Sequence, residues 1–132
     1  MRKAILVMAV LAVTSGSAMA EWVQLAVSDD GKQTIYADPA IRKAGNRVKM
    51  WVMTDFNMPQ KAANGRLYLS DNSQMGYDCN EELGRYTFFS WHAGHMGAGE
   101  IVTTKNLPNN EWVPVPPKSL LDREMKFACG KR

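Results

Sequence analysis

The sequence predicts an α+β protein dominated by β structure, with an antiparallel meander of about six strands and one C-terminal helix. Two observations support this prediction. Short runs rich in β-branched and aromatic residues alternate with turn residues along most of the chain. A stretch with helical periodicity then follows a proline-rich segment near the C-terminus.

The first 20 residues have the three parts of a secretory signal peptide. Arg2 and Lys3 form a positive region, residues 4–13 are apolar, and Ala18-Met19-Ala20 is an A-x-A cleavage motif. The apolar run is too short to cross a bilayer core, which needs roughly 20 residues. We therefore expect a cleaved signal over residues 1–20.

Cleavage would leave a single domain over residues 21–132 without a transmembrane segment. Export to the periplasm is the favoured location, and the cell surface or secretion are the alternatives. Loss of Arg2 and Lys3 lowers the basic residues from 16 to 14 against 13 acidic residues, so the net charge falls from +3 to +1. The sequence has no run of Lys and Arg, so a nucleic-acid partner is not expected.

Cys79 and Cys129 are the only cysteines in the sequence. In an oxidising compartment an even cysteine count indicates a disulfide, and two cysteines allow a single intramolecular pairing. Closing so long a loop contributes about 4 kcal/mol in the chain-entropy model. A redox-active or nucleophilic thiol is the alternative, which the absence of a C-x-x-C motif disfavours.

The first two predicted strands cover residues 22–27 and 34–37, with a tight turn at Gly31 between them. Pro39 ends the second strand because it lacks a backbone donor. After a turn at residues 44–46, the longest regular alternation of the chain begins. Period two places Val48, Met50, Val52, Thr54 and Phe56 on one face and Arg47, Lys49, Trp51, Met53 and Asp55 on the other.

Residues 57–65 are polar and contain Pro59, which predicts a loop. Further strands are predicted over residues 66–79, 85–91 and 100–104. Whether the strand over residues 66–79 is interrupted near Asp71-Asn72 is left open.

The last segment changes character. Pro114, Pro116 and Pro117 predict an extended approach that contains no regular strand or helix. Ser119 is then a candidate N-cap for a helix, and Gly130 supplies its stop. Helical spacing predicts one apolar stripe that consists of Leu121, Met125 and Ala128. Cys129 would lie close to this stripe.

No catalytic residues are predicted and no cofactor is expected, because the sequence lacks a nucleophile-elbow motif and has only 2 histidines. His92, His95 and Met96 are the best candidates for metal ligands, since imidazole and thioether groups suit copper. Glycines flank this cluster and no third histidine exists. We therefore interpret it as a structural turn and expect no metal.

Trp51 shares its predicted strand face with Arg47 and Lys49. Aromatic side chains beside cations are common anchors of protein interfaces. These three residues are therefore the candidate interaction surface. The alternative is that Trp51 fills a thin core.

Segments spread over nearly all of the expected mature chain also resemble a known family. They are Tyr36-Ala37-Asp38-Pro39, residues 48–55, Tyr77-Asp78-Cys79, residues 96–100, residues 112–117 and Ala128-Cys129-Gly130. In their order and spacing they are similar to the surface-adhesin protein E-like domain of small exported proteins from Gram-negative bacteria.

This resemblance implies a single twisted antiparallel sheet, with the C-terminal helix packed on it and pinned by a Cys79–Cys129 disulfide. It also implies a homodimer as one assembly state. The adhesin that names the family binds host matrix proteins such as vitronectin and laminin. Anchored relatives carry a lipid-bearing cysteine after the signal, where this chain has Glu21, which favours the periplasm.

The sequence therefore predicts a non-enzymatic binding module of the bacterial envelope whose partner is a host-matrix or envelope protein. Two other classes stay open. One is a periplasmic inhibitor or accessory protein that uses residues 57–65 as a plug. The other is a metal carrier that uses His92, His95 and Met96.

Cleavage after Ala20 gives a direct test of export. The exported protein is expected to begin with Glu21-Trp22-Val23 because the A-x-A motif ends at Ala20. N-terminal sequencing of protein from a periplasmic fraction measures this. Material that begins at Met1 in that fraction would contradict the prediction.

Overall fold

A computed structural model of the chain describes residues 21–130, so the predicted signal peptide lies outside the described residues. These residues form an eight-stranded sheet with the order β1-β2-β4-β5-β6-β7 along its main path. β3 pairs with β4, and β8 pairs with β6. The elements are β1 (Val23–Val27), β2 (Gln33–Ala37), β3 (Arg42–Ala44), β4 (Arg47–Lys61), β5 (Leu67–Asp78), β6 (Leu83–His92), the 3₁₀ turn η1 (His95–Gly97), β7 (Ile101–Asn106), β8 (Val113–Pro114) and α1 (Leu120–Cys129).

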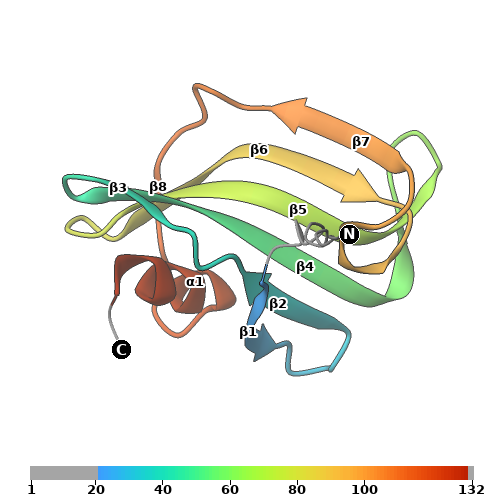
Figure 1. Ribbon diagram of the computed structural model, residues 1–132, viewed down its shortest axis with the longest axis horizontal. Helices are drawn as coiled ribbons and strands as arrows, with labels where there is room; N and C mark the ends of the chain where they lie inside the picture. Colours follow the sequence, from blue (N-terminus) through green and yellow to red (C-terminus); the bar gives the residue numbers. More distant parts are fainter. Residues whose placement is uncertain (1–20, 131–132) are drawn as a thin grey trace, which may run out of the picture.

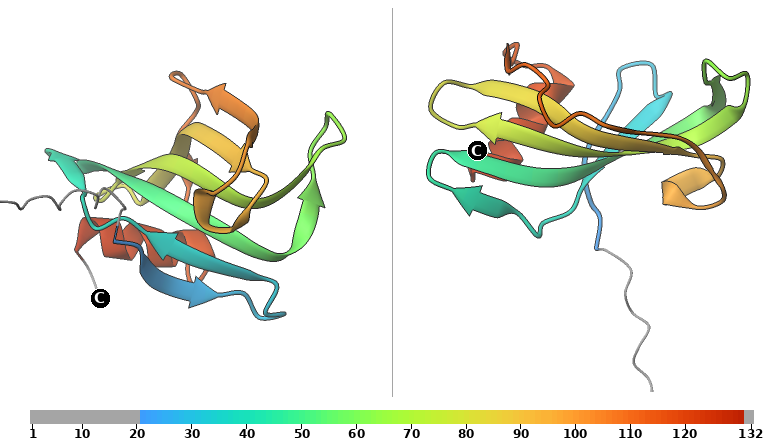
Figure 2. Two further views of the ribbon diagram at one scale, coloured as in Figure 1. Left: turned by 45° about the vertical axis from the view of Figure 1, so that its right-hand side comes forward. Right: turned by 90° about the horizontal axis from the view of Figure 1, so that it is seen from above.

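The architecture confirms the predicted fold class. All strand pairs are antiparallel, and the main path follows chain order apart from the short β3. Figures 1 and 2 show a strongly twisted sheet with α1 against one of its faces. No helix within residues 21–130 has the length and apolarity needed to cross a membrane.

The hydrophobic core lies between α1 and the sheet. Val48, Met50 and Val52 are buried there, as the alternation along β4 predicted. Tyr77 from β5 is fully buried beside them. The core cluster consists of Ile35, Ala37, Val48, Met50, Val52, Met75, Tyr77, Val115, Met125 and Ala128. The opposite face of the sheet carries no helix in the part of the chain that the structure describes.

The C-terminal helix has the caps that the sequence predicted. The Ser119 side chain accepts a hydrogen bond from the backbone N–H of Asp122 at 3.0 Å. Gly130 takes the left-handed conformation and donates to the carbonyls of Lys126 and Phe127. A disulfide joins Cys79 to Cys129 and so links the last turn of the helix to the end of β5.

The loop predicted over residues 57–65 is wrong for its first part, because β4 continues to Lys61. The register of β4 on β5 jumps from Asp55↔Ser70 to Gln60↔Tyr68. Pro59 falls within this bulge and has no partner on β5 in that register. Its missing N–H therefore removes no hydrogen bond from the β4–β5 ladder.

Three further details differ from the sequence-based expectations. β5 runs without interruption through Asp71-Asn72. Pro114 pairs with Leu83 as part of β8, although a proline segment was expected to exclude a strand; β8 is a two-residue edge strand, where proline is tolerated. Met53, predicted on the same face of β4 as Arg47 and Lys49, is only 1% exposed. A Cβ on Gly97 would lie 3.0 Å from the methyl carbon of Met53, so η1 covers this side chain.

A buried carboxyl group lies between α1 and the sheet. Glu124 is 8% exposed, and its Oε1 accepts a hydrogen bond from the hydroxyl of Tyr77 at 2.9 Å. Burial raises the pKa of Glu124 to about 7, although the hydrogen bond from Tyr77 acts in the opposite direction. The folded protein therefore favours the protonated side chain.

The free energy of unfolding should decrease as the pH rises from about 4.5 through about 7, because the native state holds a proton that the unfolded state has released. The pKa of Glu124 is about 7 in the folded protein and 4.5 in the unfolded chain. This difference corresponds to a loss of about 3 kcal/mol in the free energy of unfolding between pH 4 and pH 8. Glu124→Gln keeps an acceptor for Tyr77 and should remove this part of the pH dependence. Urea unfolding at several pH values measures it, with exposed Glu111→Gln as the control. Equal pH profiles for the wild type and Glu124→Gln would contradict the prediction.

Candidate functional site

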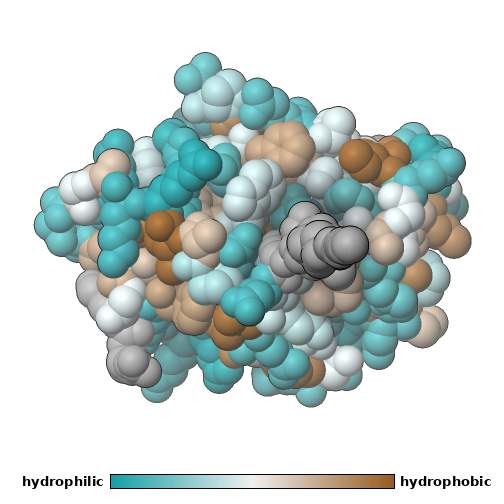
Figure 3. Space-filling model, viewed as in Figure 1, coloured by the Kyte–Doolittle hydropathy of each residue, from teal (hydrophilic) through white to brown (hydrophobic). Residues whose placement is uncertain are grey.

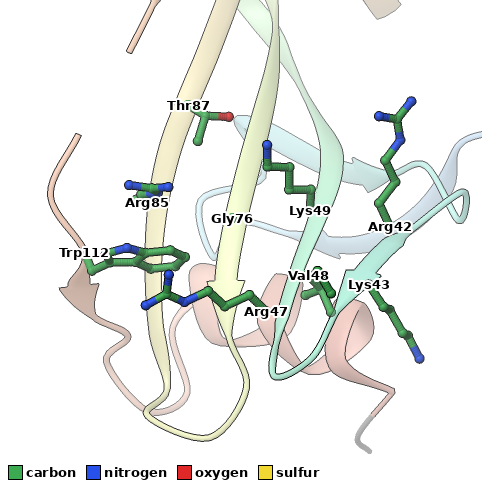
Figure 4. Close-up of a pocket in the computed structure, with 10 residues that line it drawn as sticks. Arg42, Lys43, Arg47, Val48, Lys49, Gly76, Arg85, Thr87 and Trp112 are labelled. Carbon is green, nitrogen blue, oxygen red and sulfur yellow. The ribbon is translucent and has the colours of Figure 1, made fainter. Parts of the chain in front are cut away.

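A groove of about 380 Å³ crosses the sheet face opposite α1, where β3, β4, β5 and β6 lie side by side. Figure 4 shows Arg47, Lys49, Arg85 and Trp112 on one side of the sheet, with α1 behind the strands. On the face seen in Figure 3, hydrophilic side chains gather over β3 and the adjoining part of β4. We call this site the basic groove, after its residues Arg42, Lys43, Arg47, Lys49, Arg85 and Trp112; Ala44, Val48, Gly76 and Thr87 complete its lining.

Local sequence patterns place the cations of β3 and β4. Arg47 and Lys49 alternate with the buried Val48 and Met50, so they point away from the core. The β3–β4 hairpin turns at Gly45, which has a φ of +63° that favours glycine. Its register pairs Arg42 with Lys49, which sets these two cations opposite each other on one face.

Trp112 reaches the groove through the pairing of β8 with β6. Val113 pairs with Gly84, which places the preceding Trp112 beside Arg85. A Cβ on Gly76 would lie 3.5 Å from Cη2 of Trp112, which is van der Waals distance, so the indole packs over this position of β5. The indole lies between two guanidinium groups, with Cζ of Arg47 4.7 Å and Cζ of Arg85 4.4 Å from a ring centroid. Figure 4 shows this arrangement directly.

The positive charge of the groove is weakly compensated. Arg47 Nε lies 3.4 Å from the carboxylate of Asp78. Hydrogen bonds from the backbone N–H of Glu81, and secondarily Arg47, lower the pKa of Asp78. No carboxylate in the described part of the chain forms an ion pair with the other four cations of the groove.

Arg85 has a distinct environment. Its Nη1 donates to the carbonyl of Asn110 at 3.1 Å, while its Nε is buried without a hydrogen-bond partner among residues 21–130. Contact with the indole and this single hydrogen bond hold the guanidinium in place. A guanidinium positioned in this way presents its remaining N–H groups in a fixed orientation, which suits a carboxylate or phosphate.

The lining of the basic groove contains no carboxylate, imidazole or thiol. Its one hydroxyl, on Thr87, donates to the backbone and side-chain oxygens of Gln74. The groove therefore has the composition of an anion-binding surface. Its chemistry is recognition by charge, with an indole that orders two of the cations.

The structure brings the three sequence-predicted surface residues to one face but gives them different roles. Arg47 and Lys49 line the groove. Trp51 lies beside it, half-buried, with its ring edge-on to Phe88 at a centroid distance of 5.7 Å. Trp51 is therefore neither a core residue nor a fully exposed anchor.

Sequence reasoning missed Arg42, Arg85 and Trp112. The turn at residues 44–46 was recognised, and reading it as a hairpin would have paired Arg42 with Lys49. Arg85 and Trp112 have no such local signal, because the β6–β8 pairing joins them across more than 25 residues. The sequence shows no run of basic residues, and the cluster forms only when four strands are assembled.

The histidine cluster is held by protein contacts. His92 Nε2 lies 2.8 Å from Ser90 Oγ, and burial lowers the pKa of His92. His95 Nδ1 lies 3.1 Å from Asp55 Oδ2, and the backbone N–H of Met96 donates to Asp55 Oδ1. Within residues 21–130 no group of three His, Cys, Asp or Glu side chains is arranged to hold a metal ion.

The segment proposed as an inhibitory plug is a tethered hairpin. Its turn closes with a hydrogen bond from the N–H of Ala62 to the carbonyl of Arg66. Arg66 forms an ion pair with Glu100 at 2.8 Å, and Asn64 donates to the carbonyl of Val102. These contacts join the hairpin to β7 and the segment before it.

Four other aromatic residues pack on one another. Tyr68 stacks on Trp91 at 4.3 Å, and Phe89 lies 5.1 Å from the same indole. Phe56 contacts Tyr68 edge-on. These residues form a satellite cluster on the sheet, and Trp112 is the one aromatic residue of the described chain that contacts cations.

Comparison with known proteins agrees with this architecture. The family model described as surface-adhesin protein E matches residues 22–130. The chain belongs to the surface-adhesin protein E family. This membership confirms the resemblance read from the sequence.

Solved structures of a member of this family share the fold. "The structure of Haemophilus influenzae protein E" aligns with a TM-score of 0.64 and 11% identity, covering 90% of this chain and 91% of that chain. A second crystal form gives a TM-score of 0.66 at 12% identity, with 92% and 97% covered. The protein from non-typeable Haemophilus influenzae gives 0.63 at 12% identity, with 92% and 83% covered. A search of curated proteins finds no match.

Neutralising one cation of the basic groove should stabilise the free protein, because Arg42 and Lys49 face each other as like charges. Lys49→Gln is expected to raise the free energy of unfolding by roughly 0.2–1 kcal/mol at low salt, with a smaller gain at high salt. Lys105→Gln is the control, since Lys105 is exposed and its cross-strand partner Phe89 is uncharged. Urea unfolding at two salt concentrations measures both. A destabilised Lys49→Gln variant at low salt would contradict the prediction.

Proposed function

We propose that this member of the surface-adhesin protein E family is an exported, non-enzymatic binding module that captures a protein partner on the sheet face opposite α1. The observation that carries the proposal is the weakly compensated positive charge around Trp112. Unpaired like charges on a folded surface cost stability, and an anionic partner surface would offset that cost. The adhesin family supports macromolecular binding as the function class.

The contact surface in this proposal is the basic groove together with Trp51. Cations around an ordered indole supply electrostatic attraction, and Trp51 with Phe88 supplies an apolar edge next to it. Host-matrix proteins and envelope proteins are the two partner classes that we propose. The protein would meet either one after export, with the periplasm as the expected location.

Charge reversal on this face tests the proposal. Arg47→Glu/Lys49→Glu should weaken partner capture at least tenfold, because two attractive contacts become repulsive. The measurement is binding of the purified exported protein to immobilised vitronectin, laminin and envelope proteins by surface plasmon resonance. Lys61→Glu/Lys105→Glu is the control, because it reverses the same number of charges at exposed sites outside the groove.

Trp51→Ala separates binding from stability in the same assay. If Trp51 contributes to the contact, truncation should reduce capture by roughly 30-fold, while the thermal midpoint falls by only a few degrees. A large core contribution would instead cost about 3–5 kcal/mol of stability. The proposed function would be overturned if Arg47→Glu/Lys49→Glu and Trp51→Ala both captured the partner as well as the wild type, per folded molecule.

A further inference from the structure

The cations of the basic groove form a row across the strands. Arg42 is on β3, Arg47 and Lys49 are on β4, and Arg85 is on β6, while Gly76 leaves the position on β5 open. Adjacent strands lie about 4.8 Å apart, so the row from β3 to β6 spans about 14 Å. One carboxylate or phosphate is too small to contact both ends of this row.

An extended peptide has a matching length. Its alternate side chains point to the same side at intervals of about 7 Å, so three acidic side chains at alternate positions cover about 14 Å. Each would meet a different part of the row: Arg42, Lys49, and the two guanidinium groups of Arg47 and Arg85 around Trp112. The residues between them would point away from the groove.

The two faces of the Trp112 ring are already occupied. Arg47 lies over the indole at 4.7 Å and Arg85 at 4.4 Å, and Figure 4 shows one on each side. Sugar rings and nucleobases that bind aromatic side chains need a free ring face. The guanidinium groups, in contrast, keep N–H groups suited to planar carboxylates. The site is therefore better suited to acidic side chains than to a stacked sugar or base.

Resting on the proposed function, we infer that the basic groove binds an extended acidic peptide segment of the partner, with Asp or Glu at three alternate positions. Such a segment would place negative charge between Arg42 and Lys49, which face each other without a carboxylate partner in the described chain. It would also neutralise Arg85, whose buried Nε lacks a hydrogen-bond partner there. The recognition element is the spacing of the acids as well as their charge.

Two capped peptides of equal composition test the spacing. The alternating probe is Gly-Glu-Ser-Glu-Ser-Glu-Gly, and the matched control is Gly-Ser-Glu-Glu-Glu-Ser-Gly. Calorimetric titration of the purified exported protein should show about tenfold tighter binding of the alternating probe, because only its acids reach both ends of the row. Added salt should weaken its binding.

Single substitutions then test the row itself. Arg42→Gln and Arg85→Gln should each weaken binding of the alternating probe about tenfold. Arg85→Lys should recover only part of the loss, since lysine keeps the charge and lacks the planar donor geometry. Lys105→Gln should leave the affinity unchanged. Thermal unfolding of every variant confirms that it is folded.

Three results would overturn the inference: equal affinity for the two peptides, no binding of either at millimolar concentration, or tighter binding of a heparin-derived tetrasaccharide than of the alternating peptide. Each of these leaves the proposed function standing if Arg47→Glu/Lys49→Glu still abolishes capture of the protein partner. Failure of the proposed function gives a different result: Arg47→Glu/Lys49→Glu would then capture the protein partner as well as the wild type does.

Discussion

The structure depends on one constraint: a single short helix covers one face of a large twisted sheet. A ten-residue helix is about 15 Å long, so α1 can cover only part of that face. The Cys79–Cys129 disulfide fixes its last turn, and the hydrogen bond from Tyr77 to Glu124 joins its inner side to β5. Among residues 21–130 no helix covers the other face of the sheet, so β4 begins with the cations Arg47 and Lys49 alternating with buried apolar residues. The division into a core face and a charged face follows from this geometry.

The charged face is ordered by backbone pairing. The β3–β4 register fixes Arg42 against Lys49, and the β6–β8 register delivers Trp112 to Arg85. Side chains held on paired strands lose less freedom on binding than side chains on loops, which lowers the entropic cost of capture. The paired strands also hold neighbouring cations in place although these repel each other. The disulfide and the core around Tyr77 supply stability elsewhere, so the groove need not contribute to it.

Local signals predicted much of this fold. The alternation of β4, the Ser119 cap and the Gly130 stop are properties of adjacent residues, and all three are confirmed. Errors arose where long-range structure overrides local preference. Pro59 indicates a loop, yet a bulge accommodates it within β4, and Met53 is on the charged side of the alternation yet is covered by η1. The site was half predicted: Arg47 and Lys49 follow from one strand. Trp112 and its cation contacts depend on the order of four strands, which no short segment encodes.

An identity of 11–12% with Haemophilus influenzae protein E shows that the sheet and its helix persist while most side chains differ. The fold alone therefore cannot identify the partner, because binding depends on side chains placed on it. Exposed cations such as Arg42 and Lys49 can change with little effect on stability. Gly76 and Trp112 are direct neighbours, since a Cβ on Gly76 would lie at van der Waals distance from the indole that orders Arg47 and Arg85. In the proposed complex the basic groove would therefore have a fixed centre and adjustable ends, with the indole as the centre and the surrounding cations matched to the acidic groups of the partner.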